Sequence, residues 1–179
     1  LHTALTTAAP TFIRYPRGPS LGLDPKKPSR IEIGEAEVIR EGTDISIWAL
    51  GPMVADAVKI SDHLLLHEGL SVGVVNARWA KPIDRDRLLE DARKVGLIVT
   101  MEDHGITGGF GSAVLEVLQE NDCLLPVERI GWPDEYVDHG SNADILRATH
   151  GISVEDSCQK VMERYRHQDP EFSTASANG

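Results

Sequence analysis

The chain has 179 residues, of which 41% are hydrophobic and only 5% aromatic, enough to pack one domain, or one domain and a piece of another, around an aliphatic core. Its formal net charge of −10 repels phosphate backbones, which excludes general nucleic-acid binding, and gives no reason to expect an anionic membrane surface as a partner. Its apolar runs are a few residues long, too short to span a membrane.

The cysteines and the N-terminus bear on the location and completeness of the chain. Cys123 and Cys158 are far apart and neither belongs to a CxxC pair, so neither a zinc site nor a redox dithiol is predicted. The two cysteines could form one disulfide or remain reduced. We expect two reduced thiols, and because thiols stay reduced in the cytosol we also expect a cytoplasmic location. We find no signal peptide, and because the chain opens at Leu1 in a helix-like sequence we expect a piece of a longer polypeptide.

The N-terminal residues have the composition of a helix, a strand and a linker. Residues 1–8 are expected to end a helix, and the β-branched and aromatic residues of 11–15 predict a short strand. Residues 19–29 contain three prolines, one glycine and two adjacent lysines, which is typical of a linker. We therefore expect the main domain to start near Arg30.

Strand and helix patterns alternate after this linker. Strands are predicted at residues 31–39, 45–50, 71–77, 97–101 and 127–130, and helices at 53–67, 84–95, 112–119, 142–149 and 154–165. The strands are nearly continuous apolar runs, as in sheets covered on both faces. The sequence therefore predicts a three-layer α/β/α domain with a mostly parallel five-stranded sheet, whose functional loops lie at the carboxyl ends of the strands.

Three local signals refine this prediction. Asp84 is the expected N-cap of its helix, and Gly69 is expected to end the helix before it. In the helix at 112–119, we expect Val114, Leu115 and Leu118 to point inward.

Two arginines, Arg14 and Arg17, bracket the end of the predicted strand at 11–15 in an otherwise acidic chain. A guanidinium offers a planar fork that matches the oxygens of a phosphate or a carboxylate. The residues alone leave two interpretations open, which are anion binding and a pair of interdomain salt bridges.

A glycine-rich loop at 105–111 follows Glu102, Asp103 and His104. It joins a strand to a helix, where backbone N–H groups can cradle an anion. Its spacing does not fit the dinucleotide fingerprint and two acids precede it, so we favour a tight, closely packed turn. His104 is either an acid–base group with a raised pKa or a hydrogen-bonded interface histidine.

Other candidates are weaker. His63 and His67 are four residues apart, but Leu64 follows His63 where an HExxH motif has glutamate, so we interpret the pair as a solvated helix face and predict no metal site. The charged loop at 134–140 fits a site or an interface equally well. No nucleophile–base pair is found, so no catalytic residue is predicted in this chain.

Five segments taken together carry a resemblance. They are residues 11–18 (TFIRYPRG), 33–42 (IGEAEVIREG), 76–84 (NARWAKPID), 100–113 (TMEDHGITGGFGSA) and 130–134 (IGWPD). They resemble the C-terminal portion of the 1-deoxy-D-xylulose-5-phosphate synthase family, which is transketolase-like. The resemblance runs in order from about residue 11 to residue 166, and the first and fourth segments are specific in combination.

The resemblance implies a homodimeric enzyme that uses thiamine diphosphate and Mg²⁺ to condense pyruvate with glyceraldehyde 3-phosphate, with loss of CO2, for isoprenoid and thiamine synthesis. It places the cofactor ligands in two preceding domains, so we expect this chain alone to bind no cofactor and to be inactive. Residues 1–18 would end the preceding pyrimidine-binding domain and 19–29 would be the linker. Residues 30–168 would form the transketolase C-terminal domain, and 169–179 a disordered tail.

The resemblance also gives roles to individual residues. Arg17 matches the YPRG arginine, which implies that it binds the phosphate of the aldehyde substrate. Arg14 is then structural, and we group it with Glu102 and His104 as candidates for an interdomain interface. The alternatives are a subunit-docking domain of a 2-oxoacid dehydrogenase β subunit and a transketolase.

Overall fold

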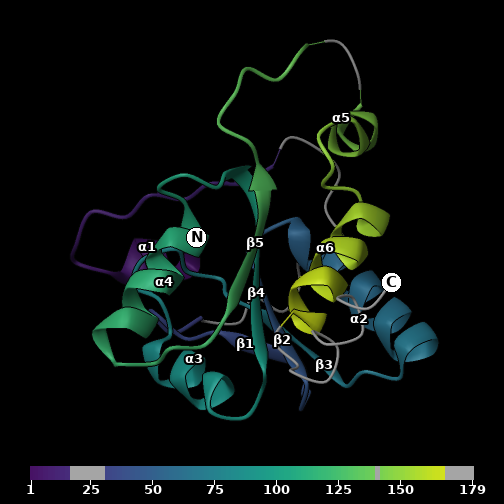
Figure 1. Ribbon diagram of the computed structural model, residues 1–179. Helices are drawn as coiled ribbons and strands as arrows, with labels where there is room; N and C mark the ends of the chain where they lie inside the picture. Colours follow the sequence, from purple (N-terminus) through teal and green to yellow (C-terminus); the bar gives the residue numbers. More distant parts are fainter. Residues whose placement is uncertain (17–30, 140–141, 168–179) are drawn as a thin grey trace, which may run out of the picture.

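The computed structural model describes residues 1–16, 31–139 and 142–167, and in them a five-stranded sheet forms the centre of the molecule (Figure 1). Its strands are β1 (Glu37–Arg40), β2 (Ile45–Ala49), β3 (Val72–Asn76), β4 (Leu97–Gly105) and β5 (Val127–Trp132), in the order β1-β3-β2-β4-β5. β1 runs antiparallel to β3, and the other three pairings are parallel. The predicted mostly parallel five-stranded sheet is confirmed.

Helices cover both faces of this sheet (Figure 1). α2 (Met53–Glu68) and α6 (Val154–Arg166) pack on one face, and α3 (Arg85–Ala92) and α4 (Phe110–Glu120) pack on the other. α1 (His2–Thr6) and α5 (Ala143–Thr149) are shorter. All five residues of β2 are buried, because alternate side chains such as Ile47 and Trp48 enter the cores on opposite faces. The three-layer prediction is confirmed.

Two of the predicted helix ends are confirmed. The Asp84 carboxylate accepts a hydrogen bond from the Arg87 N–H at 3.1 Å, which satisfies one of the free donors of α3. Gly69 has a φ of 69°, in the left-handed region that suits glycine, and its N–H donates to the Leu64 carbonyl at the end of α2.

Other predictions need correction. Residues 11–16 form no regular strand, because a strand needs a neighbour to pair with and none lies beside them in the described part of the chain. Leu115 is 38% exposed, whereas Val114 and Leu118 are buried, so the inward face of α4 is narrower than predicted. β1 is also shorter than the predicted strand at 31–39. The linker at 19–29 and the tail at 169–179 lie outside the described residues.

Cys123 and Cys158 are both free thiols, as predicted. No helix in the described ranges combines the length and the apolar character that crossing a membrane would require.

Candidate functional site

The carboxyl end of β4 is the part of the sheet where the candidate residues gather. From β2 the chain moves to β3 on one side and to β4 on the other, which makes the carboxyl ends of β2 and β4 a switch point of the sheet. Open α/β sheets bind their ligands at such points. Glu102, Asp103 and His104 are close to the end of β4, at this edge.

Glu102 is fully buried and its carboxylate lies at the N-terminus of α4. Its two oxygens accept hydrogen bonds from the N–H groups of Phe110 at 2.6 Å and Gly111 at 2.9 Å. These donors have no partner within the helix, and the positive end of the helix dipole favours the negative charge. An internal carboxylate therefore occupies the position that an external anion would take.

Two glycines of the loop, Gly109 and Gly111, stand where there is no room for a side chain. A Cβ on Gly109 would overlap the Glu102 Oε2 atom and would lie 2.6 Å from the Gly105 carbonyl oxygen. A Cβ on Gly111 would lie 2.5 Å from the Thr100 hydroxyl oxygen. The interpretation of the loop as a tight, closely packed turn is confirmed.

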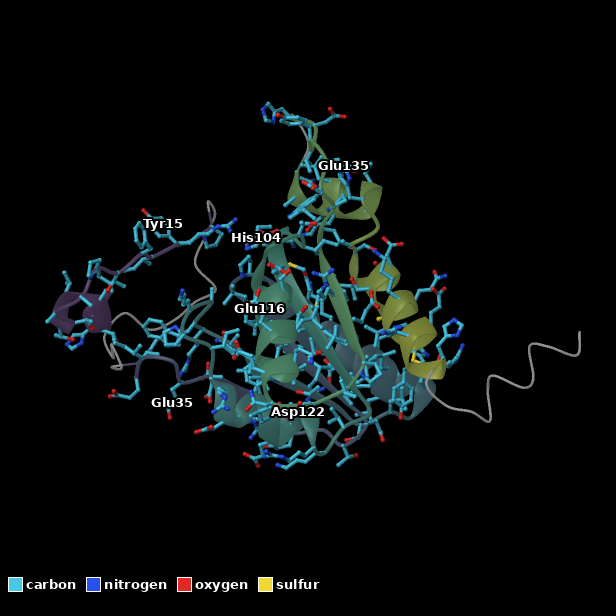
Figure 2. All side chains as sticks on the ribbon, turned by 60° about the vertical axis from the view of Figure 1, so that its left-hand side comes forward. Tyr15, Glu35, His104, Glu116, Asp122 and Glu135 are labelled. Carbon is cyan, nitrogen blue, oxygen red and sulfur yellow. The ribbon has the colours of Figure 1, made fainter. Side chains whose placement is uncertain are left out.

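His104 lies beside Glu102 at the rim of the same edge (Figure 2). Its Nε2 is 3.2 Å from the Glu102 Oε2, and its Nδ1 is 2.7 Å from the Gly105 carbonyl oxygen. Both ring nitrogens therefore face hydrogen-bond acceptors. One is the Gly105 carbonyl oxygen, and the other is the Glu102 carboxylate, which has no proton to donate when it is ionised. The side chain is 35% exposed, so the ring is held from the interior while part of it stays open to solvent.

The side chain of Asp103 is held by Trp132 and Arg147. Its Oδ1 accepts hydrogen bonds from Trp132 Nε1 at 3.0 Å and from Arg147 Nη2 at 3.2 Å. Arg147 comes from α5, and its Nη1 also donates to Asp56 in the first turn of α2 at 3.1 Å. The side chain of Arg147 thus joins the start of α2 to the end of β4 and occupies the switch point itself.

Arg14 reaches the same stretch from the N-terminal segment. Its Nη2 donates to the backbone carbonyl of Asp103 at 3.1 Å. Figure 2 shows Tyr15, the next residue, on the segment that lies to the side of the edge marked by His104. The structure therefore brings Arg14, Glu102 and His104 to one place, while Arg17 lies outside the described residues and its role stays a prediction.

Two residues at this edge, Arg147 and His150, make contacts that give no signal in the sequence. Arg147 is 44 residues from Asp103 and 91 from Asp56, and nothing near it in the sequence marks it as their partner. The indole of Trp132 contacts the ring of His150 edge-on, with 5.6 Å between centroids, and His150 Nδ1 lies 2.8 Å from the Glu135 carboxylate.

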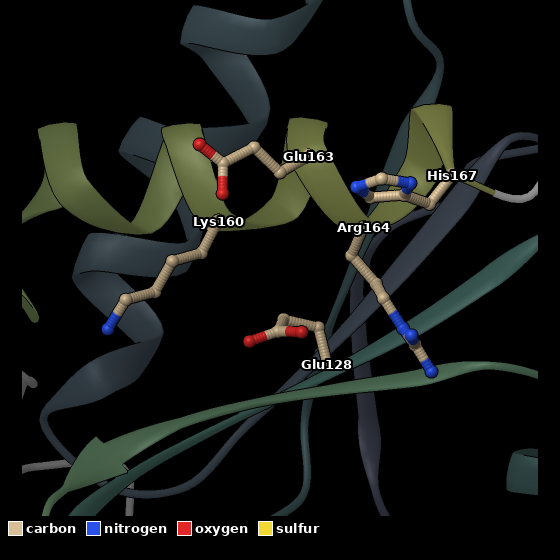
Figure 3. A pocket seen from close by; sticks show the side chains of 5 residues that line it. All are labelled: Glu128, Lys160, Glu163, Arg164 and His167. Atoms are coloured by element: carbon tan, nitrogen blue, oxygen red, sulfur yellow. The ribbon is translucent and has the colours of Figure 1, made fainter. Parts of the chain in front are cut away.

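A second group of charged side chains lies elsewhere, between β5 and α6 (Figure 3). They line a shallow depression and are Glu128, Lys160, Glu163, Arg164 and His167. Burial raises the pKa of Glu128 above 4.5, although nearby cations oppose this shift. Among the residues that the structure describes, no three His, Cys, Asp or Glu side chains are grouped so that they could hold a metal ion.

The model of the transketolase C-terminal domain matches residues 34–156. The chain belongs to this family. Its relatives include the 1-deoxy-D-xylulose-5-phosphate synthase of Methylacidiphilum infernorum, 44% identical over 168 residues that make up 93% of this chain and 26% of that protein. The synthase of Heliobacterium modesticaldum is 42% identical over 164 residues, 91% of this chain and 25% of that protein. The chain thus spans about a quarter of the length of these curated relatives.

A solved structure supports the fold of this transketolase C-terminal domain. It is described as a split gene transketolase in an inactive β4 tetramer, and it superposes with a TM-score of 0.73 at 36% identity. The superposition covers 84% of this chain and 48% of that one. The three-layer arrangement is therefore a fold that this solved relative shares.

Proposed function

We propose that the chain is the C-terminal part of a 1-deoxy-D-xylulose-5-phosphate synthase, which condenses pyruvate with glyceraldehyde 3-phosphate and releases CO2. The observation that carries the proposal is the 44% identity to the Methylacidiphilum infernorum synthase across 93% of this chain. The dehydrogenase β-subunit alternative has no comparable support. A transketolase is the second candidate, because the split gene transketolase is 36% identical over the superposed residues.

In this proposal the chain contributes a phosphate ligand and a domain interface. Arg17 binds the phosphate of the aldehyde, since a phosphate dianion suits the guanidinium fork. Residues 1–18 end the preceding domain, and Arg14 and His104 form its interface with residues 30–168. Glu102, grouped with them in the sequence analysis, is fully buried and supports this interface from the interior by its contact with His104. The exposed side chains of Phe12 (99%) and Tyr15 (81%) support this arrangement, because they offer apolar surface to a domain that precedes them.

The N-terminus of α4, the anion-binding candidate of the sequence analysis, does not fit the diphosphate of thiamine diphosphate. The N–H groups of Phe110 and Gly111, at the start of the helix after the glycine-rich loop, already donate to Glu102. In agreement with what the resemblance to the synthase family implies, we place the ligands of thiamine diphosphate and Mg²⁺ in the preceding domains of the homodimer. Two free thiols support a reducing, cytoplasmic location.

The test is the activity of the full-length polypeptide that carries these residues, supplied with pyruvate, glyceraldehyde 3-phosphate, thiamine diphosphate and Mg²⁺. Formation of 1-deoxy-D-xylulose 5-phosphate is expected. Transfer of ketol units between sugars without this product would identify a transketolase instead. Activity that requires a separate partner chain would favour the subunit-docking alternative.

The role of Arg17 is tested in the same enzyme. Arg17→Ala is expected to raise KM for glyceraldehyde 3-phosphate far more than KM for pyruvate, because only the aldehyde carries a phosphate. The control is Arg166→Ala, which removes an exposed arginine that pairs with Glu68 on another face. An equal rise in both KM values would contradict the phosphate role.

A further inference from the structure

We propose that Arg147 is an electrostatic latch, which holds helix α5 closed over the switch point at the carboxyl ends of β2 and β4 and releases it when its ion pairs break. The segment that moves is α5 with one flanking residue on each side, residues 142–150, which we call the strap. The inference goes beyond the proposed function and does not depend on it, because it rests on contacts between described residues of this domain.

The strap has little apolar contact to keep it in place. Its helix is seven residues long, and none of them is buried. Ile145, which would be expected to anchor such a helix, is 54% exposed. A helix this short is not stable on its own in water, and in proteins it usually persists because it buries an apolar face. The strap therefore needs polar contacts to keep its position.

Arg147 joins the strap to the rest of the domain. Its Nη1 donates to Asp56 at 3.1 Å, and its Nη2 donates to Asp103 at 3.2 Å. Asp56 lies in the first turn of α2 and Asp103 lies close to the end of β4, two elements that pack into the core. The side chains of Arg147 and Asp56 are only 13% and 15% exposed, so solvent screens this pair less than a surface ion pair.

The strap has a fixed point and a hinge at its C-terminal end. Ile152, two residues beyond the strap, is 3% exposed and belongs to the core that α2 and α6 form with the sheet. Gly151, which stands between them, has a φ of 65°, in the left-handed region that suits glycine. A change in the backbone angles of Gly151 can therefore move α5 without disturbing the core.

The closed position carries a cost that opening would relieve. The Nε of Arg147 is buried and has no hydrogen-bond partner among the described residues, whereas water would supply one. Figure 1 shows α5 at the end of the molecule toward which the β5 arrow points. Opening would uncover Asp56, Asp103 and Trp132 at the switch point, where open α/β sheets bind ligands. The position of α5 therefore controls access to this point.

The test is amide hydrogen exchange, followed by mass spectrometry, in the full-length polypeptide that carries these residues. In Arg147→Met we expect the amides of α5 to exchange about 10–100-fold faster than in the wild type, because hydrogen bonds between charged groups hold the closed position. The amides of α2 and β4 should keep their wild-type rates. Arg166→Met removes an exposed arginine that pairs with Glu68, and as the matched control it should leave α5 unchanged.

Two further variants separate the ion pairs from the packing of the arginine side chain. Arg147→Lys keeps the charge but loses the planar fork that reaches two carboxylates, so its exchange in α5 should lie between those of the wild type and Arg147→Met. Asp56→Asn removes the charge of one partner and should also accelerate exchange in α5. Because it leaves Arg147 in place, Asp56→Asn keeps the test open if Arg147→Met does not fold.

Hydroxyl-radical footprinting checks what the strap covers. Oxidation of Trp132 should be faster in Arg147→Met than in the wild type, because release of α5 uncovers the switch point. Oxidation of Trp132 at the wild-type rate would overturn this part of the inference.

Two results of the exchange experiment would overturn the latch itself. Unchanged exchange of α5 in both Arg147→Met and Asp56→Asn would mean that other contacts hold the strap. Equal acceleration in α5, α2 and β4 would mean that Arg147 stabilises the whole domain and does not act on α5 in particular. Neither result depends on which reaction the full-length polypeptide catalyses.

Discussion

The carboxylate of Glu102 lies against the Cα of Gly109 with no room between them for a methyl group. The same carboxylate is fully buried and accepts the N–H groups of Phe110 and Gly111. The loop therefore has its shape because it closes over a charged group that α4 stabilises. This explains why glycine stands next to an acidic segment without an external anion being involved.

A substitution of Gly109 by alanine should be strongly destabilising. The new Cβ would overlap Glu102 and crowd the Gly105 carbonyl and the His104 ring, so the chain must shift or lose its hydrogen bonds. We expect a loss of about 2–3 kcal/mol in the free energy of unfolding, measured by urea denaturation. The control is Gly105→Ala, where the nearest atom to the added Cβ is 4.0 Å away. Equal stability of the two variants would contradict this account of the loop.

A buried carboxylate on α3, that of Asp91, leads to a second prediction. Asp91 is 3% exposed, accepts hydrogen bonds from Ser46 and Trp48, and pairs with Arg87 at 2.6 Å. Arg87→Met would leave this charge buried without its cation, and we expect a loss of about 3 kcal/mol of stability.

The measurement for Arg87→Met is again equilibrium unfolding in urea, at neutral pH. Arg85→Met is the control, since Arg85 lies on the same helix and, within the described part of the chain, its side chain makes a single exposed hydrogen bond, to Asn121. We expect Arg85→Met to cost less than about 1 kcal/mol. If both variants lost the same small amount, Arg87 would not be neutralising a buried charge.

Much of the fold could be predicted because its signals are local. The apolar run ISIWA predicts a doubly buried strand, Asp84 predicts a helix start and Gly69 a helix end, and each is found at its place. The segment at 11–15 has strand-like residues too, yet it forms no strand. Strand formation depends on a pairing partner, which composition does not reveal.

The candidate site was predicted less completely because its contacts are distant in the sequence. Glu102 was recognisable as an acid before a glycine-rich loop, but its partners Phe110 and Gly111 follow eight and nine residues later. The bond between Asp103 and Arg147 joins residues 44 apart, with helix α4 and strand β5 between them in the sequence. Neither periodicity nor spacing encodes such a contact, so only the folded chain shows it.

The pKa of Glu128 gives a prediction about pH. Burial raises this pKa above 4.5, with Arg164, Lys160 and Arg129 opposing the shift, so the folded state holds the proton more tightly than the unfolded chain does. The ionised carboxylate therefore costs stability, and the cost grows as the pH rises from 4.5 through the raised pKa. Glu128→Gln should unfold about 1–2 °C higher than the wild type at pH 8 and at the same temperature near pH 4.

Thermal unfolding across this pH range checks the prediction for Glu128. Glu116→Gln is the control, because Glu116 is an exposed glutamate on α4 and is not among the charges that shift the pKa of Glu128. Its unfolding temperature should follow that of the wild type at each pH. A Glu128→Gln variant that is less stable than the wild type at pH 8 would show that the cations outweigh burial.

The two cysteines should differ sharply in reactivity. Cys158 is 5% exposed, and burial together with the charge of Glu155 raises the pKa of its thiol to about 11. On the order of 0.1% of it is then thiolate at pH 8, and thiolate is the reactive form. Iodoacetamide at pH 8 should therefore alkylate the more exposed Cys123 first and reach Cys158 only after unfolding in urea, as followed by peptide mass spectrometry. Cys123→Ser should take up almost no label while folded, whereas rapid labelling of that variant would mean that the core around α6 opens far more readily than its burial implies.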